Sequence, residues 1–211
     1  MFRDRTEAGK RLAEILTKFK NENPIILAIP RGGVVVADEI AKNLNANLDI
    51  IVPRKIGAPG NPELAIGAVA QDGSLYIDEN LVKDLGVSEN YIKKEMKKEL
   101  QEIERRLKKY RKRKKYPSFK NKTLILVDDG IATGATMKAA IQFLKKQNPK
   151  KIIVAVPVAP RDTVNELEKI VDEVIVVEKP IFMGAIGEFY VDFRQVEDEE
   201  VINILKKYYG N

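Results

Sequence analysis

The stretch "ILVDDGIATGAT", residues 125–136, joins a run of aliphatic residues to two adjacent carboxylates and then to a loop of small and hydroxylated residues. Short β-branched runs that are apolar throughout are typical of strands buried on both faces of a sheet. We expect such strands at 25–29, 48–52, 123–127, 151–158 and 173–177, alternating with helices at 6–19, 33–44, 134–147 and 161–170. This alternation predicts an α/β fold with a doubly wound, mostly parallel sheet, in a single domain over residues 1–211.

The loop after the carboxylates has the chemistry of an anion site at the carboxyl end of a parallel strand, where α/β sheets bind ligands. Backbone N–H groups around Gly130 and Gly134, the hydroxyls of Thr133 and Thr136, and the dipole of the next helix all favour negative charge. No lysine follows the second glycine, so this is not a Walker A loop. A phosphate monoester therefore fits better than a nucleotide γ-phosphate.

Asp128 and Asp129 would repel that phosphate, so they must face something else. Carboxylates one turn upstream of the loop can accept hydrogen bonds from hydroxyl groups a few ångströms from the phosphate. Ribose 5-phosphate has this layout, with a phosphate at one end and a vicinal diol at the other. The alternative is that both acids are solvated turn residues that only cap the helix.

The thirteen residues "LILVDDGIATGAT", 124–136, resemble the phosphoribosyl-pyrophosphate (PRPP) signature of type I phosphoribosyltransferases. The resemblance extends over about residues 5–200 and implies the fold of that family, Mg²⁺ as cofactor, and transfer of the 5-phosphoribosyl group from PRPP to a purine or pyrimidine base with release of pyrophosphate. It implies catalytic roles for Asp128 and Asp129. It also implies a 5-phosphate-binding loop made of Gly130, Ile131, Ala132, Thr133, Gly134, Ala135 and Thr136.

Two further stretches resemble the pyrophosphate-binding parts of this family. "AIPRGG", 28–33, ends a strand and opens a helix, which implies roles for Arg31, Gly32 and Gly33. "PRKIGAPGNPELAIGAV", 53–69, occupies the position of the flexible catalytic loop, so that Arg54 and Lys55 would reach the pyrophosphate. Composition predicts a mobile loop at "GAPGNP" and a hairpin that turns at Asp72-Gly73, within a flexible region of about 54–77. The alternative for both basic residues is simple exposure on a hairpin.

The stretch "IFMGAIGEFYVDFRQV", 181–196, resembles the hood that covers the acceptor base, over about 179–197. One or two of its aromatic residues would stack on the base, with Phe182, Phe189 and Tyr190 as candidates, and the others would belong to the core. "EFYVDFR" resembles the hood of purine phosphoribosyltransferases. That resemblance implies a pyrophosphate contact for Arg194 and a metal contact for Glu188, with Asp192 as the competing candidate.

A helical insertion of about 78–115 carries the positive charge of the chain. Residues 93–115 hold 13 basic and 4 acidic side chains, a net charge of +9, against +6 for the whole chain. Ile92, Met96, Leu100, Ile103, Leu107 and Tyr110 recur at helical spacing and predict one apolar stripe on a charged rod. We expect this helix to pack on the core or on a partner subunit of a homodimer, and we do not favour nucleic-acid binding. The alternatives are a regulator of the same fold that senses PRPP or a nucleotide and binds RNA or DNA through this helix, and a non-catalytic assembly protein.

The chain contains no Cys, His or Trp, which excludes thiolate nucleophiles, histidine bases and Cys/His zinc sites. It has neither an 18-residue apolar run nor an apolar segment near its charged N-terminus, so we expect a soluble cytoplasmic protein without a membrane partner. High Lys and Glu content without Cys is typical of a thermophile. Because the loop 54–65 matches neither the orotate nor the purine type, the acceptor base stays open.

Overall fold

The computed structural model describes residues 1–112 and 115–209. Its centre is a parallel sheet of five strands in the order β2-β1-β6-β7-β8. These strands are β1 (Ile25–Ala28), β2 (Asn47–Ile50), β6 (Thr123–Val127), β7 (Lys151–Val158) and β8 (Glu173–Glu178). All five predicted strands and the doubly wound α/β class are confirmed.

Helices cover both faces of this sheet, because successive side chains of its central strands are buried on opposite sides. Ile125 and Val127 belong to the hydrophobic cluster beneath α1 (Arg5–Leu16), α2 (Gly32–Leu44) and α7 (Asp198–Lys206). Leu124 and Leu126 pack beneath α5 (Ala135–Lys145) and α6 (Arg161–Glu168). A 3-10 helix, η1 (Thr17–Glu22), continues α1, and a second, η2 (Ile186–Phe189), lies in the hood.

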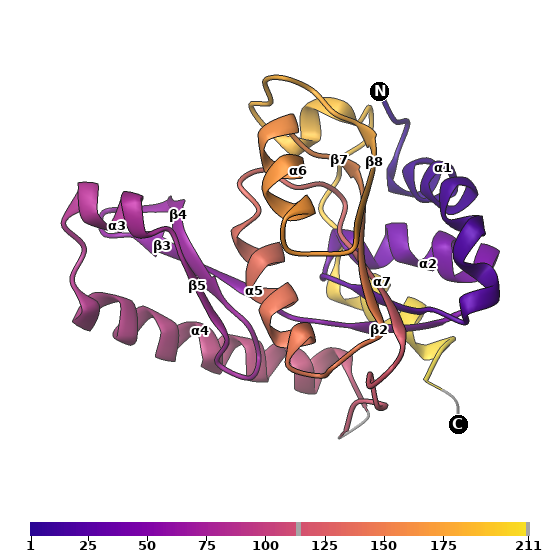
Figure 1. The fold of residues 1–211 in the computed structure, drawn as a ribbon, viewed down its shortest axis with the longest axis horizontal. Helices are drawn as coiled ribbons and strands as arrows, with labels where there is room; N and C mark the ends of the chain where they lie inside the picture. The colour runs from indigo at the N-terminus through magenta and orange to yellow at the C-terminus, as the bar shows by residue number, and fades with distance from the viewer. Residues whose placement is uncertain (113–114, 210–211) are drawn as a thin grey trace.

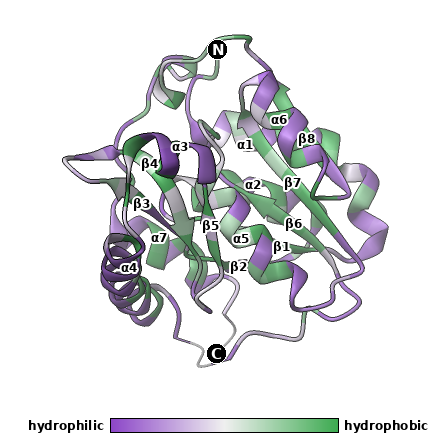
Figure 2. Cartoon of the chain, turned by 60° about the vertical axis from the view of Figure 1, so that its left-hand side comes forward, coloured by the Kyte–Doolittle hydropathy of each residue, from purple (hydrophilic) through white to green (hydrophobic). Residues whose placement is uncertain are grey.

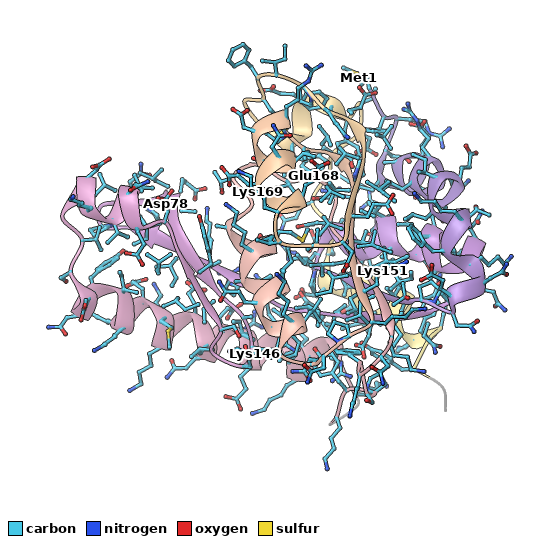
Figure 3. The ribbon with its side chains drawn as sticks, in the orientation of Figure 1. Met1, Asp78, Lys146, Lys151, Glu168 and Lys169 are labelled. Carbon is cyan, nitrogen blue, oxygen red and sulfur yellow. The ribbon has the colours of Figure 1, made fainter. Side chains whose placement is uncertain are left out.

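A second, antiparallel sheet is formed by β3 (Arg54–Ala58), β4 (Asn61–Val69) and β5 (Leu75–Ile77). The expectation of a loop at "GAPGNP" is wrong, because these residues belong to two paired strands and the tight turn between them. Pro59 and Gly60 suit the second and third positions of a type II turn, and Gly60 has a φ of +73°. The predicted turn at Asp72-Gly73 is confirmed, and Lys146 at the end of α5 donates to Ser74 Oγ at 2.8 Å beside it (Figure 3).

The predicted helical insertion consists of α3 (Glu79–Leu85) and α4 (Glu89–Tyr110), which extend with the small sheet away from the body of the molecule (Figure 1). The apolar stripe of α4 is confirmed. Its residues pack on the core cluster, next to β3, β4 and α7, while the outer side of the helix is hydrophilic (Figure 2). The basic residues Arg113 and Lys114 lie outside the described residues. No described helix is both long enough and apolar enough to cross a membrane.

A buried ion pair ties the end of α4 to the edge strand β2. Arg111 donates from Nε and a terminal nitrogen to the Asp49 carboxylate at 2.8 and 2.9 Å, and both side chains are almost fully buried. The Tyr209 hydroxyl donates to the same carboxylate at 3.0 Å, and the Arg111 guanidinium lies 3.7 Å from the centre of the Tyr116 ring. Removing one partner from such a pair costs about 3–5 kcal/mol of stability, since a buried charge is left uncompensated.

Candidate active site

The loop at residues 130–136, which we call the phosphate loop, connects β6 to α5. Two hydrogen bonds anchor it to β7 and α6. Ile131 N donates to Val158 O at 2.9 Å, and Thr163 Oγ1 donates to Ala132 O at 2.9 Å. Gly134 stands just before the helix with a φ of +82°, and no side chain caps this end. The five N–H groups from Ala132 to Thr136 therefore meet no acceptor among the described residues. Open amides at a helix N-terminus form a site for an anion such as a phosphate.

The two acids stand immediately before this loop, at the carboxyl end of β6. Asp129 N donates to Asp128 Oδ1 at 2.8 Å, so the first carboxylate is held by the backbone of the second residue. Burial and the neighbouring Asp129 charge raise the pKa of Asp128 well above the usual range of a carboxyl group. An acid pair that resists carrying two charges is suited to a ligand that brings positive charge or hydroxyl donors.

The glycines of the predicted pyrophosphate loop lie directly against these acids. A methyl group at Gly32 would lie 2.0 Å from Asp129 Oδ2, and one at Gly33 would lie 3.0 Å from Asp128 Cα. A side chain at position 32 would require its neighbours to shift, and one at position 33 would make unusually tight contacts. The structure therefore brings together two motifs that stand about a hundred residues apart in the sequence. The Pro30–Arg31 peptide bond between β1 and α2 is cis.

The four basic residues predicted to bind pyrophosphate are each paired with a carboxylate of the protein. Arg31 lies 3.8 Å from Asp198, whose carboxylate also accepts hydrogen bonds from Lys109 at 2.6 Å and from the Tyr110 hydroxyl. The remaining pairs are Arg54 with Glu99 at 2.8 Å, Lys55 with Glu63 at 3.1 Å, and Arg194 with Glu200 at 3.1 Å. The structure thus gives each of these cations a protein partner, and their contact with pyrophosphate stays a prediction.

Arg5 is a site residue that the sequence did not reveal. Its Nε donates to Asp129 Oδ2 at 2.7 Å, and a terminal nitrogen donates to Arg194 O at 2.7 Å. Its guanidinium carbon lies 4.0 Å from the centre of the Phe193 ring, and the residue is only 9% exposed. One signal was present, because Arg5 stands three residues before Ala8 on the buried stripe of α1. A cation on an apolar stripe needs a buried partner.

The hood is held against the N-terminal residues. Phe2 N donates to Phe189 O at 2.7 Å, and Val191 N donates to Phe2 O at 2.8 Å. Tyr190 lies between Phe2 and Phe193, with ring centroids 5.3 and 4.9 Å apart, and its hydroxyl donates to Asp129 O at 2.7 Å.

Tyr190 is only 6% exposed, and its hydroxyl supports the main chain of the acid pair. Its contact with a base stays a prediction. Phe189 is half-buried, and Phe182 is 90% exposed, so Phe182 is the most accessible of the three aromatic candidates. Stacking of either on a base stays a prediction.

The two metal candidates of the hood lie on the surface. Glu188 and Asp192 are exposed, and Asp192 Oδ1 accepts a hydrogen bond from Arg194 N at 3.1 Å. Within residues 1–112 and 115–209, no group of three acidic side chains could hold a metal ion. Mg²⁺ commonly binds through one or two carboxylates together with substrate phosphates. A metal contact of Glu188 or Asp192 stays a prediction.

A parallel α/β sheet with an open amide loop, an acid pair and a glycine turn at its carboxyl edge is the arrangement expected from the resemblance to type I phosphoribosyltransferases. The model of the phosphoribosyl transferase domain matches residues 5–194, so the chain belongs to the phosphoribosyl transferase family of enzymes. The resemblance stated from the sequence is thereby confirmed over nearly the expected range.

Two relatives are similar to this chain at higher sequence identity. The protein TT1426 of Thermus thermophilus is 40% identical, its solved structure superposes with a TM-score of 0.83, and the match covers 100% of both chains. A Mycobacterium tuberculosis protein named "Putative phosphoribosyl transferase" is 37% identical over 207 residues in the strains CDC 1551 and H37Rv. That match covers 98% of this chain and 47% of the relative, so the chain spans about half the length of these curated relatives.

A more distant structure shows the fold alone. The AQ2163 protein of Aquifex aeolicus is 14% identical and superposes with a TM-score of 0.52 over 83% of this chain and 73% of its own.

Proposed function

We propose that the protein binds PRPP with Mg²⁺ and transfers the 5-phosphoribosyl group to a ring nitrogen of a purine or pyrimidine base, releasing pyrophosphate. The observation that carries the proposal is the adjacency of the open amide loop and the acid pair. The loop suits the 5-phosphate, and the acids suit the ribose hydroxyls beside it. The close approach of Gly32 to Asp129 places the predicted pyrophosphate loop directly beside the acid pair.

In the proposed reaction the ring nitrogen forms a bond to C1 of the ribose while the bond from C1 to the pyrophosphate oxygen breaks. The leaving pyrophosphate takes the electron pair, and positive charge develops on the ribose. Asp128 and Asp129 stabilise that charge by preorganised electrostatics. With no histidine in the chain, the proton of the base passes to a carboxylate or leaves by the basicity of the substrate itself. Bound Mg²⁺ would neutralise charge on the pyrophosphate.

A substrate screen tests the proposal. PRPP, Mg²⁺ and each purine or pyrimidine base are incubated with the protein, and pyrophosphate release is measured, with Asp128→Asn as the control. Base-dependent release that the variant lacks supports the proposal. If no base promotes release and calorimetry detects neither PRPP nor ribose 5-phosphate binding, the proposal is wrong.

A second candidate function concerns the outer face of α4. Lys93, Lys94, Lys97 and Lys98 are exposed on adjacent turns and form no ion pair with a described residue. Such a face favours the regulator alternative, in which the protein binds RNA or DNA through this helix. Filter binding to RNA at two salt concentrations tests it, because phosphate contacts make affinity steeply dependent on salt. Replacing these four lysines by glutamine should abolish binding, whereas glutamine at Lys10, Lys20, Lys145 and Lys150 should not.

Three further parts of the proposal concern the context of the protein. A homodimer is tested by sedimentation, a cytoplasmic location by fractionation of cells, and thermophilic origin by a melting temperature well above that of mesophilic domains.

A further inference from the structure

We propose that Arg5 is a positioning residue for the phosphoribosyl transfer, because one guanidinium joins the Asp129 carboxylate to the main chain of the hood. The inference rests on the proposed function and adds to it a residue outside the family motifs. It explains how the acid pair and the hood are held in fixed positions relative to each other.

The first part of the argument is geometric. Arg5 Nε engages Asp129 Oδ2 at 2.7 Å, and the Asp128 carboxyl shares a side-chain hydrogen bond with Asp129. The cation therefore restrains the rotation of the Asp129 carboxylate, which sets the direction in which its other oxygen would meet a ribose hydroxyl. Gly32 makes this possible, because a methyl group there would lie 2.7 Å from Arg5 Nε as well as 2.0 Å from Asp129 Oδ2.

The second part concerns charge. The groups that face Asp129 are the Asp128 carboxylate on the same strand end, the Arg5 guanidinium from α1 and the Tyr190 hydroxyl from the hood, which bonds the Asp129 carbonyl. Arg5 is the only cation in hydrogen-bond contact with the pair among the described residues. It also lowers the pKa of Asp128, against the larger effects of burial and of the Asp129 charge. Without Arg5, two adjacent carboxylates would stand uncompensated.

The third part concerns the hood. The same guanidinium donates to Arg194 O at 2.7 Å and lies over the Phe193 ring at 4.0 Å. Because Arg5 contacts both Asp129 and the hood, we expect the orientation of the carboxylate and the ordering of the hood to depend on each other. Arg11 provides a matched control, since it lies on the same helix over the Phe2 ring but contacts neither the acids nor residues 193–194.

The experiment compares wild type with Arg5→Gln, Arg5→Lys and Arg11→Gln. Calorimetry measures the affinity for ribose 5-phosphate and for inorganic phosphate, carboxyl NMR follows the titration of Asp128, and hydrogen exchange follows the amides of residues 186–196. For Arg5→Gln we expect at least tenfold weaker ribose 5-phosphate binding, phosphate binding within twofold of wild type, a higher pKa of Asp128 and faster exchange in the hood. Arg5→Lys should rescue the titration more than the hood exchange, and Arg11→Gln should change neither.

Unchanged Asp128 titration and hood exchange in Arg5→Gln would overturn the inference. Failure of this inference can be distinguished from failure of the proposed function, because the Asp128 titration and the hood exchange are measured without a ligand. If wild type does not bind ribose 5-phosphate, the proposed function fails, while the titration and the exchange still decide the role of Arg5. If Arg5→Gln does not fold, the double variant Arg5→Gln/Asp129→Asn removes both partners and should fold, since no buried charge is left alone. A double variant as unstable as the single one would also overturn the inference.

Discussion

The two ends of the proposed PRPP site are built in opposite ways. At the phosphate loop, residues 132–136, the donors are backbone N–H groups that have no acceptor in the described part of the chain. At the pyrophosphate end, the candidate donors are side chains, and each one already has a carboxylate partner: Arg31 with Asp198, Arg54 with Glu99, Lys55 with Glu63, and Arg194 with Glu200.

The phosphate loop is therefore a preformed subsite. At the pyrophosphate end, the cations would have to exchange a protein carboxylate for the ligand. The loop needs no rearrangement to accept a phosphate, because its amides are already fixed by β6 and α5. The cations must leave their carboxylates before they can bind pyrophosphate. All four pairs are at least partly exposed, and an exposed ion pair contributes about 0–1 kcal/mol, so the exchange is energetically easy.

The largest expected effect concerns the acid that lies between the two ends. Asp129→Asn should lower turnover about 10²-fold or more, by analogy with the loss of one preorganised electrostatic contact. It should also lower the free energy of unfolding by about 3 kcal/mol or more, because buried Arg5 loses its partner. Steady-state kinetics and denaturant unfolding measure the two effects. Full activity of the variant would show that the Asp129 carboxylate does not contact the ribose during the reaction.

A smaller effect is expected at the preformed end. The Thr136 hydroxyl has no partner among residues 1–112 and 115–209, and Thr136→Val should weaken ribose 5-phosphate binding by roughly 1–3 kcal/mol, the cost of a lost charge-assisted hydrogen bond. Calorimetry measures the affinity. Thr17→Val is the control, since Thr17 donates to Ala13 O far from the site. Equal ribose 5-phosphate affinity in both variants would show that the Thr136 hydroxyl does not contact the ligand.

The next effect is on stability and depends on pH. The pKa of Asp128 is raised in the folded protein above its unfolded value, so this group stabilises the fold when protonated, and that contribution is lost as pH rises from the unfolded value through the folded one. Asp128→Asn should therefore raise the melting temperature by a few degrees at pH 7.5, while its turnover falls. Near pH 4 the gain should disappear. A variant equally stable relative to wild type at both pH values would contradict the raised pKa.

The smallest effect sharpens the comparison at the exchangeable end. Glu200→Gln releases Arg194 from its pair and should tighten pyrophosphate binding about two- to fivefold, in line with the low worth of an exposed pair. Inhibition by pyrophosphate measures it. Glu199→Gln, on the same turn of α7, is the control and should change nothing. No difference between the two variants would indicate that Arg194 does not bind pyrophosphate.

The sequence predicted the features that depend on residues close together in the chain. The five strands were visible because each is a short apolar run, and the phosphate loop was visible because Gly134 and the threonines stand next to a helix start. The sequence did not predict contacts made across the fold. Arg5 meets Asp129 from 124 residues away, and Tyr190 is buried because Phe2 reaches it from the other end of the chain. The turn at Pro59-Gly60 was misread because composition alone does not show that its flanking strands pair.

The pair of Asp49 and Arg111 has a consequence for the lifetime of the native state. Asp49 collects donors from Arg111, 62 residues away, and from Tyr209, 160 residues away. Contacts that close such long loops carry an entropic cost, so we expect this pair to form late in folding. Interactions absent from the folding transition state act mainly by slowing unfolding. We therefore expect this pair, which holds the end of α4 against β2, to slow unfolding more than it speeds folding.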